Sequence, residues 1–381
     1  MSFVTVVIPC YNVAEYIDRC MQSVVNQSYK DFAVILIDDG SKDNTLNKCL
    51  AWEKRDSRIT VVSKHNEGLG FTRNLGVRMA ASEYITFLDA DDYWQEDYMR
   101  KMIDGTENGQ NDIVMCDFNF VFECDNGDTT FRTSVLRFPA GKLHDETFLL
   151  SRSRAYAWGK LYRRSLFIDN HVEQPNHAYE DVSVTPFVIA LAKSVYHVDK
   201  PLYYYLRNRP TSLMNRANSL PGMILSLDEL ADRFHKANLF QKFRHELRRV
   251  FWGDVCFLHR VLNSQFSDED AKKINRLKND ILAITYREFP ELSVLADCRY
   301  YVSEHPALVE GVKHLVLENE QVSLDATMLS ATDVAVVTDY ADLSKDFTGK
   351  IICIDFNGRN TNDFERLTWD LTDEIFERVL I

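Results

Sequence analysis

The sequence predicts an α/β protein built on a mostly parallel sheet that is flanked by helices. Over residues 4–121, apolar runs of strand length alternate with segments whose apolar residues recur at helical spacing. Two of these runs end in carboxylates, the first in Asp38-Asp39 and the second in Asp89-Ala90-Asp91-Asp92. Open parallel sheets bind ligands at the carboxyl ends of their strands, so this pattern also predicts the place of a functional site.

Length, charge and cysteine content restrict the class of protein. With 381 residues the chain is long enough for two domains, or for one domain with a substantial extension. The formal net charge of -13 argues against nucleic acid as a partner, because binding to its phosphates needs a basic surface. The scattered cysteines form no CxxC pair and are expected to be reduced, which favours a cytoplasmic protein. No basic leader opens the chain and no apolar run is long enough to span a bilayer, so any membrane association is expected to be peripheral, at the inner face of the cell membrane.

The elements of the first region are expected in a regular order. Strands are predicted over residues 5–8, 32–37, 59–62, 84–88 and 112–116, and Pro9 is expected to stop the first of them. The first helix has Ile17, Met21 and either Val24 or Val25 on one stripe. Residues 41–44 supply cap chemistry for a second helix through Leu46, Leu50 and Trp52, and further helices are expected over 72–81 and 98–103.

The pattern changes twice along the rest of the chain. Residues 117–215 mix short aromatic strands with candidate helices near 143–151 and 182–192, and these strands either form an acceptor pocket or only extend the sheet. Helical spacing dominates over 221–290, and strand signals return at 334–337 and 351–354. We therefore expect a first domain over 1–217, a helical extension over 218–300 and a small α/β region over 301–381, which is either complete or one part of a larger domain.

The helical extension is compatible with several roles. Its basic residues outnumber its acidic ones over 232–254, but they are not confined to one stripe. Homo-oligomerisation, docking of a polymerase partner and contact with an anionic membrane surface therefore stand beside a simple solvated face.

The two acid clusters indicate a metal and a nucleotide. Densely packed carboxylates repel one another unless a cation lies among them, and hard divalent cations prefer oxygen ligands. One of Asp89 and Asp91 can then face a ribose while the other ligates the metal, although an acidic turn explains the same residues. Asp39 can accept the ring N–H of a uracil, although both acids of its doublet can instead cap the next helix.

Three arginines and one further acid complete the candidate site. Arg73 begins a helix, where the backbone dipole also favours anions, and Arg207 with Arg209 forms a second candidate clamp for phosphates. Structural ion pairs and solvated surface positions are the alternatives for these arginines. Asp181 stands at the start of another helix, either as a cap or as a general base that accepts a proton from an attacking hydroxyl. Trp158 is either a stacking surface for a sugar or part of the core.

Taken together, these segments resemble the family 2 inverting glycosyltransferases, which have the GT-A (Rossmann-like) fold. The resemblance covers roughly residues 3–215 in the order and spacing of the family. It rests on Val6-Val7-Ile8-Pro9-Cys10-Tyr11-Asn12, Asp38-Asp39-Gly40-Ser41, Gly68-Leu69-Gly70, Arg73-Asn74-Leu75-Gly76, Asp89-Ala90-Asp91-Asp92 and Glu180-Asp181. Phe71 and Thr72 depart from the usual smaller residues, which concerns the shape of the pocket.

The resemblance implies a role for each matching residue. Pro9 and Tyr11 would border the nucleotide, Asp39 would read the uracil, Asp89 would contact the nucleoside side, and Asp91 would hold Mn²⁺ or Mg²⁺. Asp181 would be the base that activates an acceptor hydroxyl, with inversion at the anomeric carbon. The expected donor is a UDP-sugar that supplies a hexose or N-acetylhexosamine, and the expected acceptor is a cell-surface glycan or a polyol phosphate.

A shorter resemblance lies in the tail. Residues 331–347 are similar to a segment of the polyol-phosphate transferases that build teichoic-acid-like polymers, with Ala341-Asp342 in place of a usual serine pair. This similarity suggests a place in cell-surface polymer synthesis.

Two other functions compete with transfer of a sugar. A sugar nucleotidyltransferase would share the sheet and the use of Mg²⁺, but it would be expected to have a glycine-rich loop after the first strand, where residues 9–14 contain no glycine. A non-catalytic module that binds a nucleotide sugar within a polymerase assembly is the second alternative.

Overall fold

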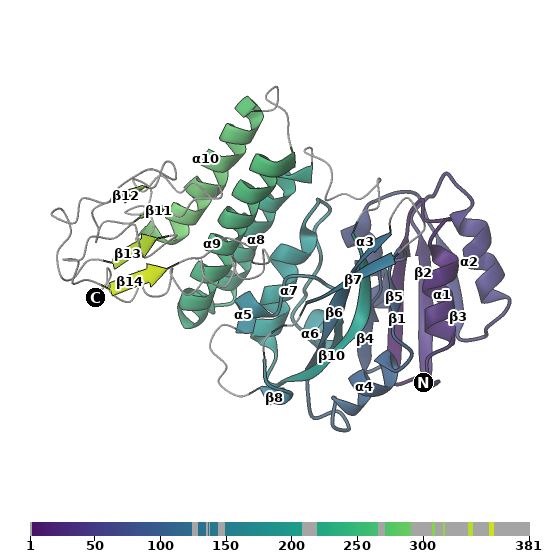
Figure 1. Cartoon of the computed structure of the whole chain (residues 1–381). Coiled ribbons are helices and arrows are strands. Elements are labelled where there is room, and N and C mark those ends of the chain that lie inside the picture. Colours follow the sequence, from purple (N-terminus) through teal and green to yellow (C-terminus); the bar gives the residue numbers. More distant parts are fainter. Residues whose placement is uncertain are drawn as a thin grey trace. The chain divides into compact units, whose positions relative to one another are not determined.

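The structure is a computed structural model. It describes residues 2–123, 129–134, 136, 138–143, 149–207, 219–265 and 271–290, together with short strands at 307–308, 315–316, 334–337 and 350–353. The chain forms two compact units, Met1–Glu246 and Leu247–Ile381 (Figure 1). The predicted boundaries after residues 217 and 300 stay predictions.

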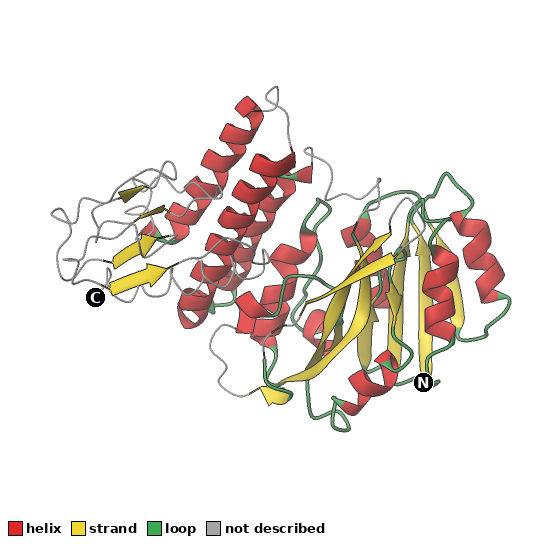
Figure 2. Ribbon diagram, viewed as in Figure 1, coloured by secondary structure: helices red, strands yellow, loops and turns green. Residues whose placement is uncertain are grey.

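One half of the large sheet in the first unit is parallel. Its strands lie in the order β3 (Ile59–Ser63), β2 (Phe32–Asp38), β1 (Val4–Cys10) and β4 (Tyr84–Phe87). The helices between them are α1 (Ile17–Val25), α2 (Thr45–Glu53) and α3 (Leu69–Met79) (Figure 2). The chain moves from β1 outward to β3 and then returns to the other side of β1, so the carboxyl end of β1 is a switch point of the kind where α/β proteins bind ligands.

Pro9 does not stop the first strand, so this detail of the prediction is wrong. Val7 O accepts a hydrogen bond from Leu88 N, while Cys10 O accepts one from Asp39 N. Odd-numbered residues of β1 therefore direct their backbone groups toward β4, and even-numbered residues toward β2. Since pairing with β4 ends at Val7, the missing N–H of Pro9 removes no hydrogen bond of the sheet.

The other half of the sheet is mixed, and it contains the aromatic strands. Antiparallel β9 (Lys160–Arg163) lies between β4 and β6 (Ile113–Glu123), and β10 (Val195–Leu206) runs parallel to β6. Three short strands join antiparallel, namely β5 (Tyr93–Trp94), β7 (Thr129–Ser134) and β8 (Gly141–Leu143). The aromatic region therefore extends the sheet, and the expected α/β class is confirmed.

Four further helices accompany this half, namely α4 (Tyr98–Asp104), α5 (Leu149–Arg152), α6 (Ser165–Ile168) and α7 (Glu180–Leu191). Of the helix expected near 143–151, residues 149–151 lie in α5, whereas Leu143 is the last residue of β8. Residues 144–148 lie outside the described part of the chain.

The core confirms the predicted face of the first helix. Ile17, Met21 and Val24 of α1 are buried as expected. In α2, Trp52 is buried and Leu50 is 37% exposed. The Trp52 indole N–H donates to Asp18 of α1 at 2.9 Å and so connects the two helices.

Three long helices follow the sheet. They are α8 (Pro221–Lys236), α9 (Phe240–Gln265) and α10 (Ala271–Glu288). Inside the first unit, α8 packs on α7, with Phe187 and Phe234 edge to face at a centroid distance of 5.4 Å. In the second unit, Phe251 and Phe289 pack at 5.3 Å, and the tail strands pair as antiparallel β11 (Ala307–Leu308) with β12 (Leu315–Val316) and parallel β13 (Val334–Val337) with β14 (Lys350–Cys353).

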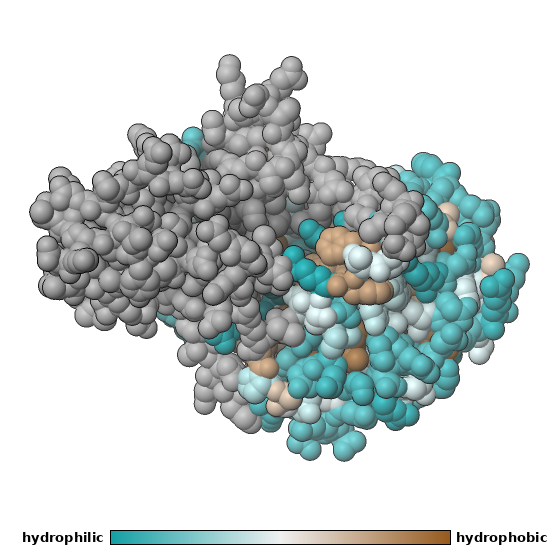
Figure 3. All heavy atoms as spheres, viewed as in Figure 1, coloured by the Kyte–Doolittle hydropathy of each residue, from teal (hydrophilic) through white to brown (hydrophobic). Residues whose placement is uncertain are grey.

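The surface of the described residues is largely hydrophilic on the face that Figure 3 shows, with small hydrophobic areas. Among the helices that the structure describes, none is long and apolar enough to cross a membrane. Cys10, Cys20, Cys49 and Cys116, the cysteines whose side chains are described, are buried free thiols.

Candidate active site

The carboxyl ends of β2 and β4 bring the two acid clusters to one edge of the sheet. Both strands pair with β1, one on each side, so Asp39 and Asp89 follow strands that are separated only by β1. Both acid clusters therefore lie at the carboxyl ends of strands, as the sequence predicts.

Asp38 and Asp39 fix the turn and the loop around this edge. Asp38 accepts hydrogen bonds from Ser41 N and Ser63 Oγ, at 3.3 and 3.2 Å. Asp39 is only 3% exposed and accepts from the backbone N of Glu67 and Gly68, both at 2.9 Å. It also forms an ion pair with Lys64. A carboxylate offers about four acceptor positions, so these three donors leave room for the N–H of a base.

Pro9 and Tyr11 lie beside this turn. Pro9 is buried in β1, whereas the ring of Tyr11 is 45% exposed. The loop after β1 is tied to the loop after β2, because Asn12 N donates to Ser41 Oγ at 3.1 Å and Lys42 N donates to Asn12 Oδ1 at 2.8 Å. This mutual anchoring holds Tyr11 next to the segment that carries Asp39.

Asp92 holds the second acid cluster against the sheet. Its buried carboxylate accepts hydrogen bonds from the Tyr203 hydroxyl at 2.7 Å and from Leu206 N at 2.8 Å, both in β10. The Tyr203 hydroxyl also accepts from Asp89 N at 3.3 Å. Burial, with Asp91 and Asp89 close by, raises the pKa of Asp92 well above its usual range. Asp92 therefore anchors the loop, while Asp89 and Asp91 keep partial exposure.

Arg73 joins the acid cluster to the start of α7. This buried guanidinium donates to Asp89 Oδ1 at 2.7 Å and to Glu180 Oε1 at 2.5 Å. Its position between two carboxylates agrees with the alternative of a structural ion pair. Arg73 is the fifth residue of α3, so the prediction that it begins a helix is wrong, and its role toward phosphates stays a prediction.

The start of α3 packs closely against the segment before α7. A Cβ on Gly70 would lie 1.9 Å from Pro175 O, so only glycine permits this close approach. Asn74 holds the same segment through two hydrogen bonds to the backbone of Gln174, each at 2.8 Å. The glycine and asparagine of this motif therefore assemble the site.

Asp181 lies in the first turn of α7, immediately after Glu180. Burial, and next the charge of Glu180, raise its pKa to about 8, although Arg73 opposes the shift. Lys160 in β9 also opposes it, and burial lowers the pKa of Lys160 itself to about 7. The Lys160 ammonium is held by the backbone oxygens of Arg154 and Tyr156, at 3.1 and 2.8 Å. A carboxyl with a raised pKa at a helix start suits a general base.

Arg207 follows β10 and lies among aromatic rings. Its guanidinium is 5.5 Å from the ring centroid of Phe120 and 5.4 Å from that of Tyr205. Arg209 lies outside the described residues, so its predicted role stays a prediction.

Trp158 is part of the core, and its interpretation as a stacking surface for a sugar is wrong. Its ring stacks on Tyr203 at 4.3 Å and on Tyr156 at 4.4 Å, and its side chain is almost completely buried. Both faces of the indole are therefore covered.

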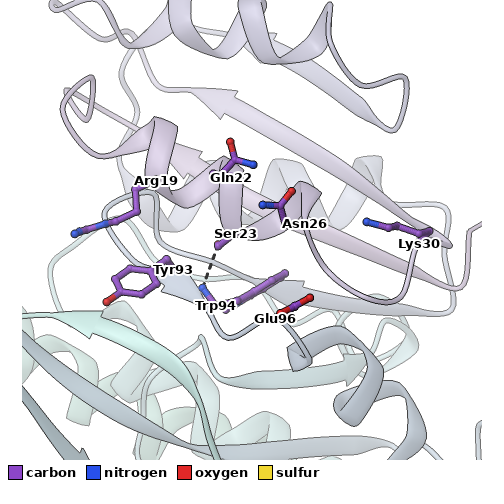
Figure 4. A pocket seen from close by; sticks show the side chains of 8 residues that line it. All are labelled: Arg19, Gln22, Ser23, Asn26, Lys30, Tyr93, Trp94 and Glu96. Carbon is purple, nitrogen blue, oxygen red and sulfur yellow. Dashed lines mark hydrogen bonds between the residues drawn. The ribbon is translucent and has the colours of Figure 1, made fainter.

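An open hollow of about 680 Å³ lies between α1 and the segment around β5 (Figure 4). It is lined by Arg19, Gln22, Ser23, Asn26, Lys30, Tyr93, Trp94 and Glu96, which do not include the predicted site residues. Arg19 connects the hollow to the acid cluster by donating to Asp91 O at 3.3 Å. The Tyr93 ring is covered by Tyr204 on one side, stacked at 4.7 Å, and by the Arg19 guanidinium at 4.8 Å, so it offers no open face for a ligand.

The acid cluster fits a divalent metal ion whose coordination is completed by phosphate oxygens of the substrate. Within the described part of the chain, no group of three or more histidine, cysteine or carboxylate side chains could hold an ion alone. Mg²⁺ is usually bound by one or two carboxylates together with substrate phosphates and waters. Asp91 and Asp89, both partly exposed, are the residues that would supply such a donor set, with one oxygen of Asp89 also bound by Arg73.

Sequence reasoning missed several residues that build this site. Glu180, Asn74, Lys64 and Tyr203 each bind a predicted site residue or the segment that carries it, and the charge of Lys160 lowers the pKa of Asp181. Only Glu180 and Asn74 had a signal, because each is adjacent to a predicted residue within a motif. The other three come from strands or loops whose positions depend on the sheet order.

Comparison with known proteins identifies the class. Residues 5–170 match the sequence model of glycosyl transferase family 2. This match covers residues 5–170 of the 381, agrees with the resemblance seen in the motifs, and supports a glycosyltransferase rather than a sugar nucleotidyltransferase.

Particular relatives and one solved structure extend this comparison. EpsH of Bacillus subtilis strain 168, named as a glycosyltransferase, is 28% identical over 265 residues, which are 67% of this chain and 76% of that protein. The poly(ribitol-phosphate) beta-glucosyltransferase of Bacillus spizizenii is 26% identical over 287 residues, 73% of this chain but only 42% of that protein. TarS of S. aureus, crystallised with UDP-GlcNAc, has a similar fold, with a TM-score of 0.52 at 20% identity over 84% of this chain and 98% of that one.

Proposed function

We propose that this chain is a metal-dependent inverting glycosyltransferase that moves a hexose or N-acetylhexosamine from a UDP-sugar to a hydroxyl of a cell-surface polysaccharide, capsule or teichoic-acid-like acceptor. The observation that carries the proposal is the Arg73 bridge between Asp89 and Glu180, because it connects the acid cluster to the helix that begins with Asp181. One connected group thus contains the carboxylates proposed for the donor and the base proposed for the acceptor.

On the donor side, the proposal assigns the nucleotide to the edge formed by β1, β2 and β4. Asp39 accepts the uracil N–H, Pro9 and Tyr11 border the base, and Asp89 contacts the nucleoside. Arg73, Arg207 and Arg209 supply positive charge toward the phosphates. A Mn²⁺ or Mg²⁺ ion held by Asp91 would offset the negative charge that develops on the departing diphosphate.

On the acceptor side, Asp181 takes the proton of the attacking hydroxyl. The acceptor oxygen then forms a bond to the anomeric carbon as the bond to the diphosphate breaks, and this single displacement inverts the anomeric centre. The raised pKa of Asp181 makes its carboxylate a stronger base than an exposed aspartate.

The names of the relatives support the substrates. The TarS structure contains UDP-GlcNAc, and the Bacillus spizizenii relative is named for transfer to poly(ribitol phosphate). The first favours a UDP-sugar donor, and the second favours a polyol-phosphate acceptor. Peripheral membrane association and homo-oligomerisation through the helical extension stay predictions, as does a role for the tail, whose residues 331–347 lie largely outside the described part of the chain.

The base assignment is tested by Asp181→Asn. We expect transfer to fall by about 10²–10⁴-fold, the usual contribution of a general base, while calorimetry finds UDP binding nearly unchanged. A screen of nucleotide sugars first identifies the donor. Retained turnover would reject Asp181 as the base, and binding of a UDP-sugar without product from any acceptor would favour the non-catalytic module.

The metal is tested by exhaustive chelation of the wild-type protein. We expect product formation to stop, because without the metal ion the negative charge of the departing diphosphate is not compensated. Addition of Mn²⁺ or Mg²⁺ should restore it. Asp91→Asn should raise the metal concentration needed for half-maximal rate. Transfer that survives chelation would remove the metal from the mechanism.

A further inference from the structure

The start of α7 has a backbone conformation that its own sequence does not favour. Tyr179, the residue before α7, has φ 63° and ψ 29°, which is the left-handed region. A large residue without the freedom of glycine adopts this conformation only where its surroundings impose it. No side-chain hydrogen bond caps the helix at Tyr179, whose backbone O accepts a hydrogen bond from Val182 N at 3.1 Å. Asp181 is only two residues after Tyr179.

Helix α8 supplies such a restraint through a buried hydroxyl. Ser226 is fully buried, and its Oγ donates to Tyr179 O at 2.5 Å. Next to it, His177 binds the backbone O of Ala178 at 3.0 Å through one ring nitrogen and Glu229 at 3.2 Å through the other. Side chains of α8 therefore hold the turn on which α7 begins.

The backbone of α8 also approaches this turn closely. A Cβ on Gly222 would lie 2.3 Å from Ala178 O, so any other residue would displace the turn or the helix. Further along, Phe187 and Phe234 keep the two helices together. On its other side, the start of α7 is held by the ion pair between Glu180 and Arg73. The turn is thus fixed from both sides.

We propose that Ser226 and Gly222 are positioning residues for Asp181: they hold Tyr179 in its left-handed conformation and thereby fix the direction of the base toward the acceptor. The inference rests on the proposed function of Asp181. The inference also assigns α8 a role in positioning the catalytic base, although the sequence of α8 lies in the segment expected to be a separate helical extension.

The test compares Ser226→Ala with Ser226→Thr and with Leu225→Ala. Ser226→Thr keeps the hydroxyl, and Leu225 is a 52% exposed neighbour on the same helix. For Ser226→Ala we expect kcat to fall by about tenfold, because small displacements of a catalytic group are costly, while the Kd for UDP stays within twofold. Ser226→Thr and Leu225→Ala should keep kcat within about threefold of wild type. Gly222→Ala should lower kcat in the same way as Ser226→Ala.

A merely structural role predicts a different result. If kcat is unchanged in folded Ser226→Ala, or if kcat and UDP affinity fall together, the positioning role is overturned. Thermal unfolding shows whether each variant is folded, and Ser226→Cys replaces Ser226→Ala if the latter does not fold, since it keeps the volume with only a weak donor.

A second measurement separates this inference from the proposed function. Amide hydrogen exchange of residues 179–182 should accelerate in Ser226→Ala but not in Leu225→Ala. If the wild-type protein turns over no UDP-sugar, the proposed function fails, yet the exchange result still decides whether α8 holds the turn. Unchanged exchange in Ser226→Ala would overturn the inference.

Discussion

The donor edge and the start of α7 are built in opposite ways. At the donor edge, Asp39 and Asp89 follow directly from buried strands, and the pairing of β2 and β4 with β1 brings their backbones to one edge before Lys64 and Arg73 bind their side chains. At the start of α7, Asp181 depends on Arg73 from α3, on Lys160 from β9 and on the contact of α8 with Tyr179. The backbone of the donor edge is positioned by the sheet, whereas the start of α7 is positioned by several side chains from distant segments.

This contrast predicts that the start of α7 is the more fragile of the two. Arg73→Met would leave Glu180 buried without its partner, and breaking such a pair typically costs about 3–5 kcal/mol of unfolding free energy. Denaturant unfolding measures the loss. The matched control is Arg78→Met on the same helix, where the exposed pair with Glu173 is expected to contribute less than about 1 kcal/mol. Equal losses in the two variants would contradict the contrast.

At the donor edge, Asp39→Ala should affect binding more than catalysis. We expect the Kd for UDP to rise by an amount that corresponds to about 1.5–3 kcal/mol, the usual value of a hydrogen bond to a charged group. Calorimetry with UDP gives this directly. Asp181→Asn serves as the comparison, since its UDP affinity should hardly change, and a weaker UDP complex in both variants would remove the distinction between the two regions.

The pH dependence sharpens the comparison further. Asp181 must be deprotonated to accept a proton, and its pKa is raised to about 8. The kcat/KM for the acceptor should therefore rise about tenfold per pH unit up to roughly pH 8 and level off above it, since this ratio reports the free enzyme. UDP binding should not follow the same curve. A rate that is already constant from pH 5 upward would show that Asp181 titrates as an ordinary exposed aspartate.

The sequence by itself determined the α/β class, the order of the parallel strands along the chain and the acidic ends of two of them. These features are local, because an apolar run followed by carboxylates is visible within ten residues. The family motifs determined the class of enzyme for the same reason. The prediction that Pro9 ends the first strand is wrong, because the energetic cost of a proline in a sheet depends on which neighbouring strand its missing N–H would face.

Only the tertiary structure decided how the site is assembled. Arg73 meets Glu180 across 107 residues, and Asp92 meets Tyr203 across 111. The left-handed Tyr179 has no sequence signal at all, because tyrosine does not favour that conformation and Ser226, which holds it, lies on another helix. Long-range contacts of this kind follow from strand order and helix packing, which residue patterns along one chain do not specify.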